Sequence, residues 1–200
     1  MSIFNTKRMT GMNSKTVEHF VLGAGIFAKN FAPGTDTYES AKKTGKLLGA
    51  TAGGGEFKAA KVGHYSQVDG VPENTKGLYI LDYWTTTMQA TVKELTADTI
   101  AAAMAAAKKT TEESVTDYDV IVPKSALELD DYTDNITYIG RIVGSEKPII
   151  IQIFNAFNTN DISIQPKDND EATVQVIFTG HYDPDNLETP PYKIYWPKEA

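Results

Sequence analysis

Apolar and polar side chains alternate along much of the second half of the chain, and this pattern predicts β-strands. In residues 171–182 every second side chain from Ala172 to Phe178 is apolar, which is the period of a strand with one buried face. Three further segments are rich in β-branched and aromatic residues and are also predicted as strands: 118–122, 135–143 and 148–157. The second half of the chain is therefore predicted to be a sheet.

The first half combines four predicted strands with one predicted helix. The strands are expected at 17–22, 26–30, 55–62 and 78–94. Residues 68–77, VDGVPENTKG, hold Asp-Gly, Pro and a closing Gly, which is the chemistry of turns. Residues 96–109 predict a helix, because Thr96 can cap its start and Lys108 and Lys109 suit its C-terminal carbonyls.

One helix among many strands predicts a mainly β protein, a β-sandwich or barrel with a single flanking helix. The length of 200 residues suits a single domain, 1–200. Residues 1–15 are polar and are expected to form an N-terminal arm. Residues 32–57 have six glycines and few large apolar side chains, which predicts a long functional loop with a reach of roughly 90 Å. The proline-bounded tail, 190–200, is predicted to be a docking strap and not a ladder strand.

Composition narrows the class of protein. A hydrophobic content of 41% with 22% charged residues is typical of a folded globular chain. No run approaches the 18 apolar residues of a membrane helix, and the N-terminus lacks the pattern of a secretory signal, so we expect cytosolic synthesis and no membrane. Cysteine is absent, which excludes disulfides and thiol chemistry.

Charge is distributed unevenly along the chain. Residues 1–109 hold 13 Lys or Arg and 9 Asp or Glu, a balance of +4, whereas residues 110–200 hold 6 and 17, a balance of −11. An acidic surface repels a phosphate backbone, so this pattern disfavours specific nucleic-acid binding. We expect a subunit with an uneven charge distribution, whose acidic region faces a molecule that the subunit does not bind.

Two glycine-rich segments look like cofactor motifs but lack the required context. Residues 23–28, GAGIFA, match G-x-G-x-x-A, yet no amphipathic helix follows them as a dinucleotide-binding unit requires. Residues 49–57, GATAGGGEF, have Gly55 and Glu56 in the places of the Lys-Ser/Thr pair of a phosphate-binding loop, and the acid of Glu56 would repel phosphate. The sequence predicts no cofactor.

No cluster of residues suggests catalysis or a metal centre. His19, His64 and His181 stand in separate segments, without a paired ligand or a serine elbow. The acidic segments 168–171 and 183–186 do not follow the spacing of a calcium-binding loop. We therefore expect no catalytic residue and no metal ligand, and a protein that is not an enzyme.

Several segments, taken in order, resemble the major tail proteins of long-tailed bacteriophages. They are GATAGGGEF (49–57), VDG (68–70), KGLYILDYW (76–84), TTTMQATVKEL followed by TADTIAAAMAA (85–106), and GHYDPDNLETPPYKIYWP (180–197). The resemblance covers roughly 45–110 and 172–197, and residues 110–170 are undistinctive. No single motif is specific to this family, but the order and spacing of the segments together are moderately specific to it.

The resemblance implies a structural virion protein with a tail-tube fold. It implies six-membered rings that stack into a hollow tube, with the genome passing through the bore without specific binding. The partners it implies are other copies of the chain, a tape-measure protein and a tail-terminator protein, and assembly would take place in the host cytoplasm. By position, 32–57 would be the inter-ring loop, and its self-assembly residues would be Gly49, Ala50, Thr51, Gly53, Gly54, Gly55, Glu56 and Phe57. We also expect that removing residues 40–55 leaves a soluble fold but abolishes tube growth.

Two other readings remain open from sequence. The first is the tube protein of a phage-derived injection apparatus, such as a secretion system or a bacteriocin. The second is a carbohydrate-binding β-sandwich, for which six aromatic residues could offer stacking faces: Tyr79, Tyr83, Trp84, Tyr192, Tyr195 and Trp196.

Overall fold

The computed structural model describes residues 10–166 and 168–198 of the chain. Of the expected N-terminal arm, residues 1–9 therefore lie outside the described residues. Residues 10–15 lead into a short 3-10 helix, η1 (Thr16–His19). No helix among the described residues is long and apolar enough to cross a membrane.

Antiparallel strands are the main regular structure of the described chain, which confirms the mainly β prediction. The strands are β1 (Val21–Lys29), β2 (Thr51–Tyr65), β3 (Tyr79–Val92), β4 (Ala107–Thr110), β5 (Val120–Pro123), β6 (Thr133–Ile142), β7 (Ile149–Asn158), β8 (Val174–Gly180) and β9 (Tyr192–Tyr195). The helices are α1 (Tyr38–Lys43) and α2 (Ala97–Met104), and a second 3-10 turn, η2, spans Leu129–Asp131.

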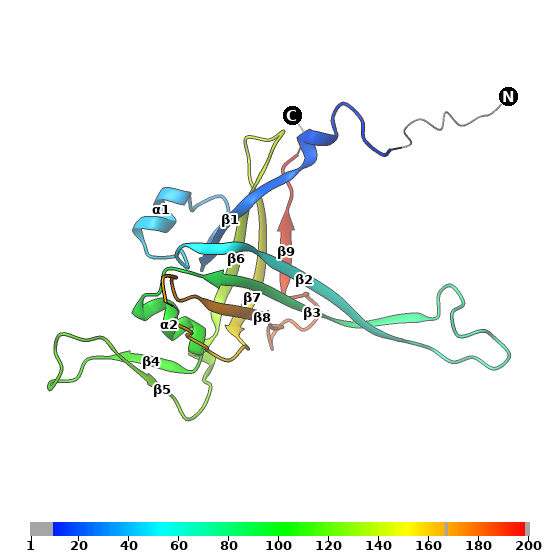
Figure 1. The fold of residues 1–200 in the computed structure, drawn as a ribbon. Helices are drawn as coiled ribbons and strands as arrows, with labels where there is room; N and C mark the ends of the chain where they lie inside the picture. The colour runs from blue at the N-terminus through cyan, green and yellow to red at the C-terminus, as the bar shows by residue number, and fades with distance from the viewer. Residues whose placement is uncertain (1–9, 167, 199–200) are drawn as a thin grey trace.

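Seven strands form one curled sheet in the order β1-β6-β7-β8-β3-β2, with β9 added beside β7 (Figure 1). β7 changes its neighbour along its length: Ile150–Ile153 pair with β9, whereas Phe157 and Asn158 pair with β8. Between these stretches Asn155 has φ of +47°, a left-handed conformation that asparagine tolerates. β4 and β5 form a separate hairpin.

The core lies inside the curl of the sheet. Alternate residues of β8 are buried, as the sequence pattern predicts, and they meet large side chains from the facing strands. The fully buried members of this core include Phe27, Met88, Ile136, Ile153 and Val174. α2 contributes the buried Ala103 to the same cluster. Burial of this apolar surface is the main force that holds the curled sheet together.

A buried polar network ties the end of β1 to β6 and β7. The Gln152 side-chain amide donates to the carbonyl oxygen of Phe31 and to Thr137 Oγ1, each at 2.8 Å. Asn135 Oδ1 accepts from the backbone N–H of Phe31 at 3.0 Å and from Thr137 Oγ1 at 2.7 Å. Since these groups are largely shielded from water, losing one of them would leave a costly unsatisfied partner.

The structure corrects several predicted elements. The predicted strand 17–22 is wrong over 17–19, which belong to η1, and its end joins the predicted strand 26–30 in one strand, β1. The register of β1 is irregular between Leu22 and Ile26. The predicted helix 96–109 ends at Met104, because Ala105 takes φ of +58° and Ala107 begins β4. The tail prediction is wrong as well, since β9 pairs with β7 in a regular antiparallel register.

Candidate assembly surfaces

A long ribbon projects from the sheet where β8 stops (Figure 1). β8 pairs with β3 only from Val92 back to Thr86, which lies opposite Gly180. The earlier residues of β3 pair with β2 alone, as far as Tyr65 opposite Tyr79. We call residues 62–83, the outer part of this hairpin and its connecting turn, the arm. A two-stranded hairpin is only marginally stable in water by itself.

Turns close the tip of the arm, as the sequence predicts for residues 68–77. The N–H of Ser66 donates to the carbonyl oxygen of Leu78 at 2.8 Å, and three hydrogen-bonded turns follow within the tip. Gly63 is required near the base of this region: a Cβ there would lie 2.2 Å from the carbonyl oxygen of Ile80 and 2.7 Å from Tyr79 Oη. The arm is therefore a β-hairpin closed by defined turns and not an irregular loop.

Large apolar side chains on the arm face solvent. The exposed ones are Tyr65, Val68, Val71, Tyr79, Ile80, Leu81 and Tyr83. Every residue from Tyr79 to Tyr83 is exposed, whereas burial alternates from Thr86 to Val92. Because successive side chains of a strand point to opposite faces, both faces of the arm are uncovered. A contiguous apolar surface of this kind marks a contact site for another molecule.

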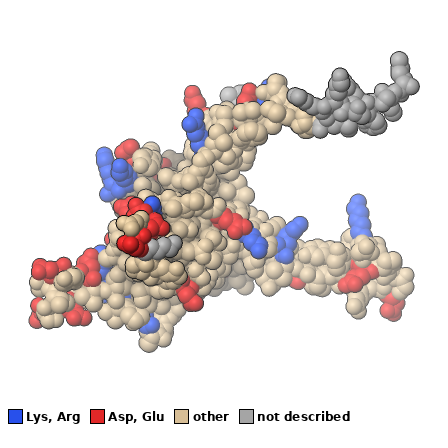
Figure 2. Space-filling view, viewed as in Figure 1, with Lys and Arg blue, Asp and Glu red and all other residues tan. Residues whose placement is uncertain are grey.

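One polar pair of the arm lies at a register irregularity of the hairpin. Val62 pairs with Tyr83 and Gly63 pairs with Leu81, so Asp82 is an extra residue on β3. The Asp82 carboxylate lies 2.9 Å from His64 Nδ1. Figure 2 shows that charged side chains gather at the root and the tip of the arm and leave its length mostly uncharged. The arm's middle is thus suited to apolar contact.

The sequence-predicted assembly residues lie at the other end of β2 and not in a loop. Gly49 and Ala50 precede the strand, and Thr51 to Phe57 belong to it, so the predicted loop 32–57 is wrong over 51–57. Gly53 and Gly54 have φ of +73° and +78° within a register shift, and a Cβ on Gly55 would lie 2.3 Å from the Phe27 ring. Gly55 thus serves close packing on β1, whereas Gly53 and Gly54 supply the left-handed backbone of the irregular register. The assembly role of Gly49, Ala50, Thr51, Gly53, Gly54, Gly55, Glu56 and Phe57 stays a prediction.

The rest of the predicted loop is also part of the fold. α1 occupies its middle, with Thr37 as its N-cap, and Ala41 and Leu48 are buried. Removing residues 40–55 would take these apolar side chains out of the core together with the start of β2. The expectation that this removal leaves the fold intact therefore conflicts with the packing.

The arm's strands and its turn could be predicted from sequence, but its projection was missed. The available signal is local: 86–92 show the alternation of a strand with one buried face, whereas YILDY at 79–83 does not. Loss of alternation within one long strand indicates the point where the strand leaves the body of the protein.

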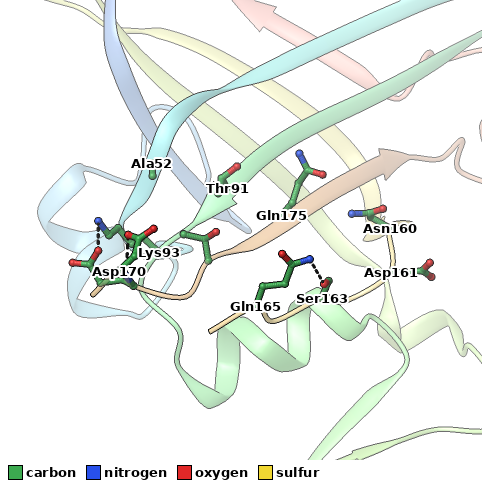
Figure 3. Close-up of a pocket in the computed structure, with 11 residues that line it drawn as sticks. Ala52, Thr91, Lys93, Asn160, Asp161, Ser163, Gln165, Asp170 and Gln175 are labelled. Carbon is green, nitrogen blue, oxygen red and sulfur yellow. Dashed lines mark hydrogen bonds and ion pairs between the residues drawn. The ribbon is translucent and has the colours of Figure 1, made fainter. Parts of the chain in front are cut away.

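A polar pocket of about 480 Å³ lies between the outer surface of β3 and β8 and the segment that precedes β8 (Figure 3). Lys93 Nζ forms an ion pair with Glu171 at 2.9 Å, and this contact raises the pKa of Lys93 and lowers that of Glu171. Gln165 donates a 3.4 Å hydrogen bond to Ser163 Oγ. Both members of the ion pair are well exposed, so solvent screens their attraction.

The six aromatic residues considered for sugar stacking do not meet at one site. Tyr79 and Tyr83 are on the arm, whereas Trp84 and Tyr192 pack edge to face at 5.6 Å against the body. Tyr195, the last residue of β9, and Trp196, which follows it, are exposed. The residues lining the pocket in Figure 3 include none of the six, so a stacking platform for a sugar is not assembled there.

The other sequence motifs have structural roles. Gly25 lies in β1, where a Cβ would lie 2.7 Å from the carbonyl oxygen of Ile139, and no helix follows it. His181 Nδ1 contacts the carbonyl oxygen of Asn155 at 2.9 Å, and its ring stacks on Phe157 at 4.9 Å. Within residues 10–166 and 168–198, no three acidic or histidine side chains come together as a metal site would need.

Comparisons with known proteins give structural likenesses at low identity. No family model and no curated protein matches the chain. Among solved structures, a chain from the virion of a native gene transfer agent particle is 15% identical, with 68% of this chain and 84% of that chain covered and a TM-score of 0.33. A chain from the tail of an empty gene transfer agent particle, refined with helical C6 symmetry, is 14% identical, with 80% and 92% covered and a TM-score of 0.36.

Proposed function

We propose that the chain is a structural subunit of a phage tail that polymerises with copies of itself into a hollow tube. The observation that carries this proposal is the arm, whose large apolar side chains are exposed on both faces. Leaving such a surface in water forfeits about 25 cal/mol for each Å² that a partner could cover. A second copy of the chain is a partner that every subunit meets, and a repeated contact of this kind builds rings or filaments.

The finer features of the proposal come from the sequence resemblance. They are six-membered rings, stacking into a tube, passage of the genome through the bore, and contacts with tape-measure and tail-terminator proteins. The sheet supports them in one respect, because β1 and β2 lie at the two ends of its main strand order and each has an open edge. Edge strands that join between neighbouring subunits would leave no open edge in a closed ring. The virion tail is the corresponding location.

Shortening the arm tests the proposal directly. Removing residues 63–82 and joining Val62 to Tyr83 through Asn-Gly replaces the arm by a two-residue hairpin turn. We expect the natural chain to form rings or hollow tubes as its concentration is raised, and the shortened chain to stay monomeric because the apolar surface is gone. Negative-stain electron microscopy and size-exclusion chromatography on the same samples would measure this.

A matched control shortens the other hairpin. Removing residues 111–119 and joining Thr110 to Val120 through Asn-Gly shortens the connection between β4 and β5 to a two-residue turn. This variant should assemble like the natural chain, and circular dichroism should show retained strands in both variants. A natural chain that stays monomeric at every concentration would overturn the proposal, whereas normal tubes from the shortened-arm variant would place the essential contact elsewhere.

A further inference from the structure

β1 and β6 separate at one end of the molecule and leave a groove. Leu22 pairs with Arg141 and Ile26 pairs with Ile139, so three residues of β1 lie opposite the single residue Gly140 of β6. Such a bulge interrupts the ladder and bends the strand. A groove of about 350 Å³ opens here, lined mainly by apolar side chains and glycines: Leu22, Gly25, Ile26, Ile139, Gly140 and Ile142.

Further apolar side chains are exposed beside the groove, and charged residues that include Lys15, Glu18, Glu146 and Lys147 line the hollow next to it. Phe20, Val21 and Leu22 are consecutive and all exposed. A neighbouring hollow of about 620 Å³ shares Ile142 with the groove and has Trp196, which is 54% exposed, in its wall. Figure 1 shows the start of β1 and the C-terminal end of the chain together at this end of the molecule. The single chain thus carries two exposed apolar surfaces, the arm and this groove.

The arm cannot fill the groove of its own chain, because it projects from a different side of the sheet and ends far from the start of β1 (Figure 1). The arm and the groove carry residues of opposite charge. The arm carries Asp82 among its apolar residues, and Arg141 stands in the groove lining. Within the described part of the chain, Arg141 has no ion-pair partner. A second copy would supply one.

We infer that the arm of one subunit docks in the β1–β6 groove of a second copy, with Asp82 facing Arg141. This inference rests on the proposed function and identifies the surface that receives the arm. The contact is heterologous, because each copy uses the arm on one side and the groove on another. Every subunit can therefore donate one arm and accept another, and the contact repeats along a series of subunits.

The lack of cysteine in the chain allows a cross-linking test without background. A chain with both Leu81→Cys on the arm and Leu22→Cys at the groove is treated with a short bismaleimide at assembling concentration. A heterologous contact links each copy to two others, so denaturing electrophoresis should show a ladder of many covalent multimers. Each single variant should remain monomeric, and a mixture of the two single variants should stop at dimers.

The matched control replaces Leu22→Cys by Leu129→Cys, at a residue in η2 that is 85% exposed. This control should give no ladder. If electron microscopy shows assembled tubes but the Leu22/Leu81 pair gives no ladder, or the control pair gives an equal one, the groove assignment is overturned while the proposed function stands. If neither the natural chain nor any variant assembles, both fail.

A charge exchange tests the same contact without cross-linking. Asp82→Arg or Arg141→Asp alone should raise the concentration needed for assembly by roughly tenfold, because each places like charges together at the interface. The double variant should recover most of the loss. Additive defects in the double variant would overturn the pairing of these two residues.

Discussion

Asn158 shows how one side chain can join separate parts of the fold. It is buried, and its amide nitrogen donates to the carbonyl oxygens of Ala103 at 2.6 Å and Asn160 at 2.8 Å. Its Oδ1 accepts from the backbone N–H of Ile177 at 2.6 Å. The sequence predicts a strand up to Phe157 but not this junction, because its partners lie 55 and 19 residues away along the chain.

Replacing Asn158→Ala should lower the free energy of unfolding by about 1–3 kcal/mol, because the Ala103 carbonyl and the Ile177 N–H lose their partner in a dry environment. Urea denaturation followed by circular dichroism would measure the loss. Asn160→Ala is the control, since it contributes only its backbone carbonyl to this network. Equal stability of the two variants would contradict the role given to Asn158.

At the scale of the elements, the long strands could be predicted and the short or constrained ones could not. Alternation over many residues indicates strands such as β3 and β8, because one buried face imposes a period of two. α1 has six residues, too few for a periodic signal, although Thr37 and Ser40 form a capping box. The alanine-rich end of the predicted helix becomes β4 because Ala107 pairs with Pro123, and tertiary pairing overrides intrinsic propensity.

The arm illustrates the same limit for the candidate site. Its strands and turn follow from local patterns, whereas its projection depends on where β8 ends opposite Thr86. That end point is set by pairing between segments about ninety residues apart, which no local pattern contains. Its receiving groove likewise depends on the register of β1 against β6.

The ion pair around α1 gives a prediction with a defined pH dependence. Asp36 Oδ2 accepts from Lys46 Nζ at 2.6 Å and from the N–H of Ala32 at 2.8 Å. The Lys46 hydrogen bond, followed by that of Ala32, holds the pKa of Asp36 below its usual 3.8. The stabilisation is therefore complete above the usual pKa and is lost as the pH falls through the lower folded-state pKa.

Asp36→Asn should accordingly be less stable than the natural chain near neutral pH, and the difference should shrink in acid. Urea midpoints of both proteins, taken from about pH 7 to about pH 2, would measure it. Asp130→Asn, at an exposed carboxylate in η2, is the control. A stability gap for Asp36→Asn that stays constant across this range would rule out the ion pair as its cause.

At the scale of the whole molecule, acidic residues lie on both projecting hairpins. The acidic residues between β4 and β5, Glu112, Glu113, Asp117 and Asp119, gather at the end of that hairpin (Figure 2). The arm also exposes acidic residues, Asp69, Glu73 and Asp82, beside its large apolar side chains. The expected polarisation of the subunit and an acidic lining of a bore therefore stay predictions.

Salt should promote assembly of this subunit. Copies with a net charge of −7 repel one another, whereas the apolar contact of the arm does not depend on screening. Raising the salt from ~0.1 M to ~1 M shortens the screening length from ~10 Å to ~3 Å. Sedimentation velocity at fixed protein concentration should show a larger assembled fraction at high salt, and a smaller fraction would mean that ion pairs dominate the contact.

The arm's lack of a third strand beside it has a kinetic consequence for a subunit that assembles in the proposed way. A lone copy must order its ribbon at the first encounter, when only one contact compensates for the lost chain entropy. A copy that joins a growing end meets several ordered neighbours at once. Initiation is then much slower than elongation, so the number of tubes is set by rare starting events and free subunits accumulate until a starter is present.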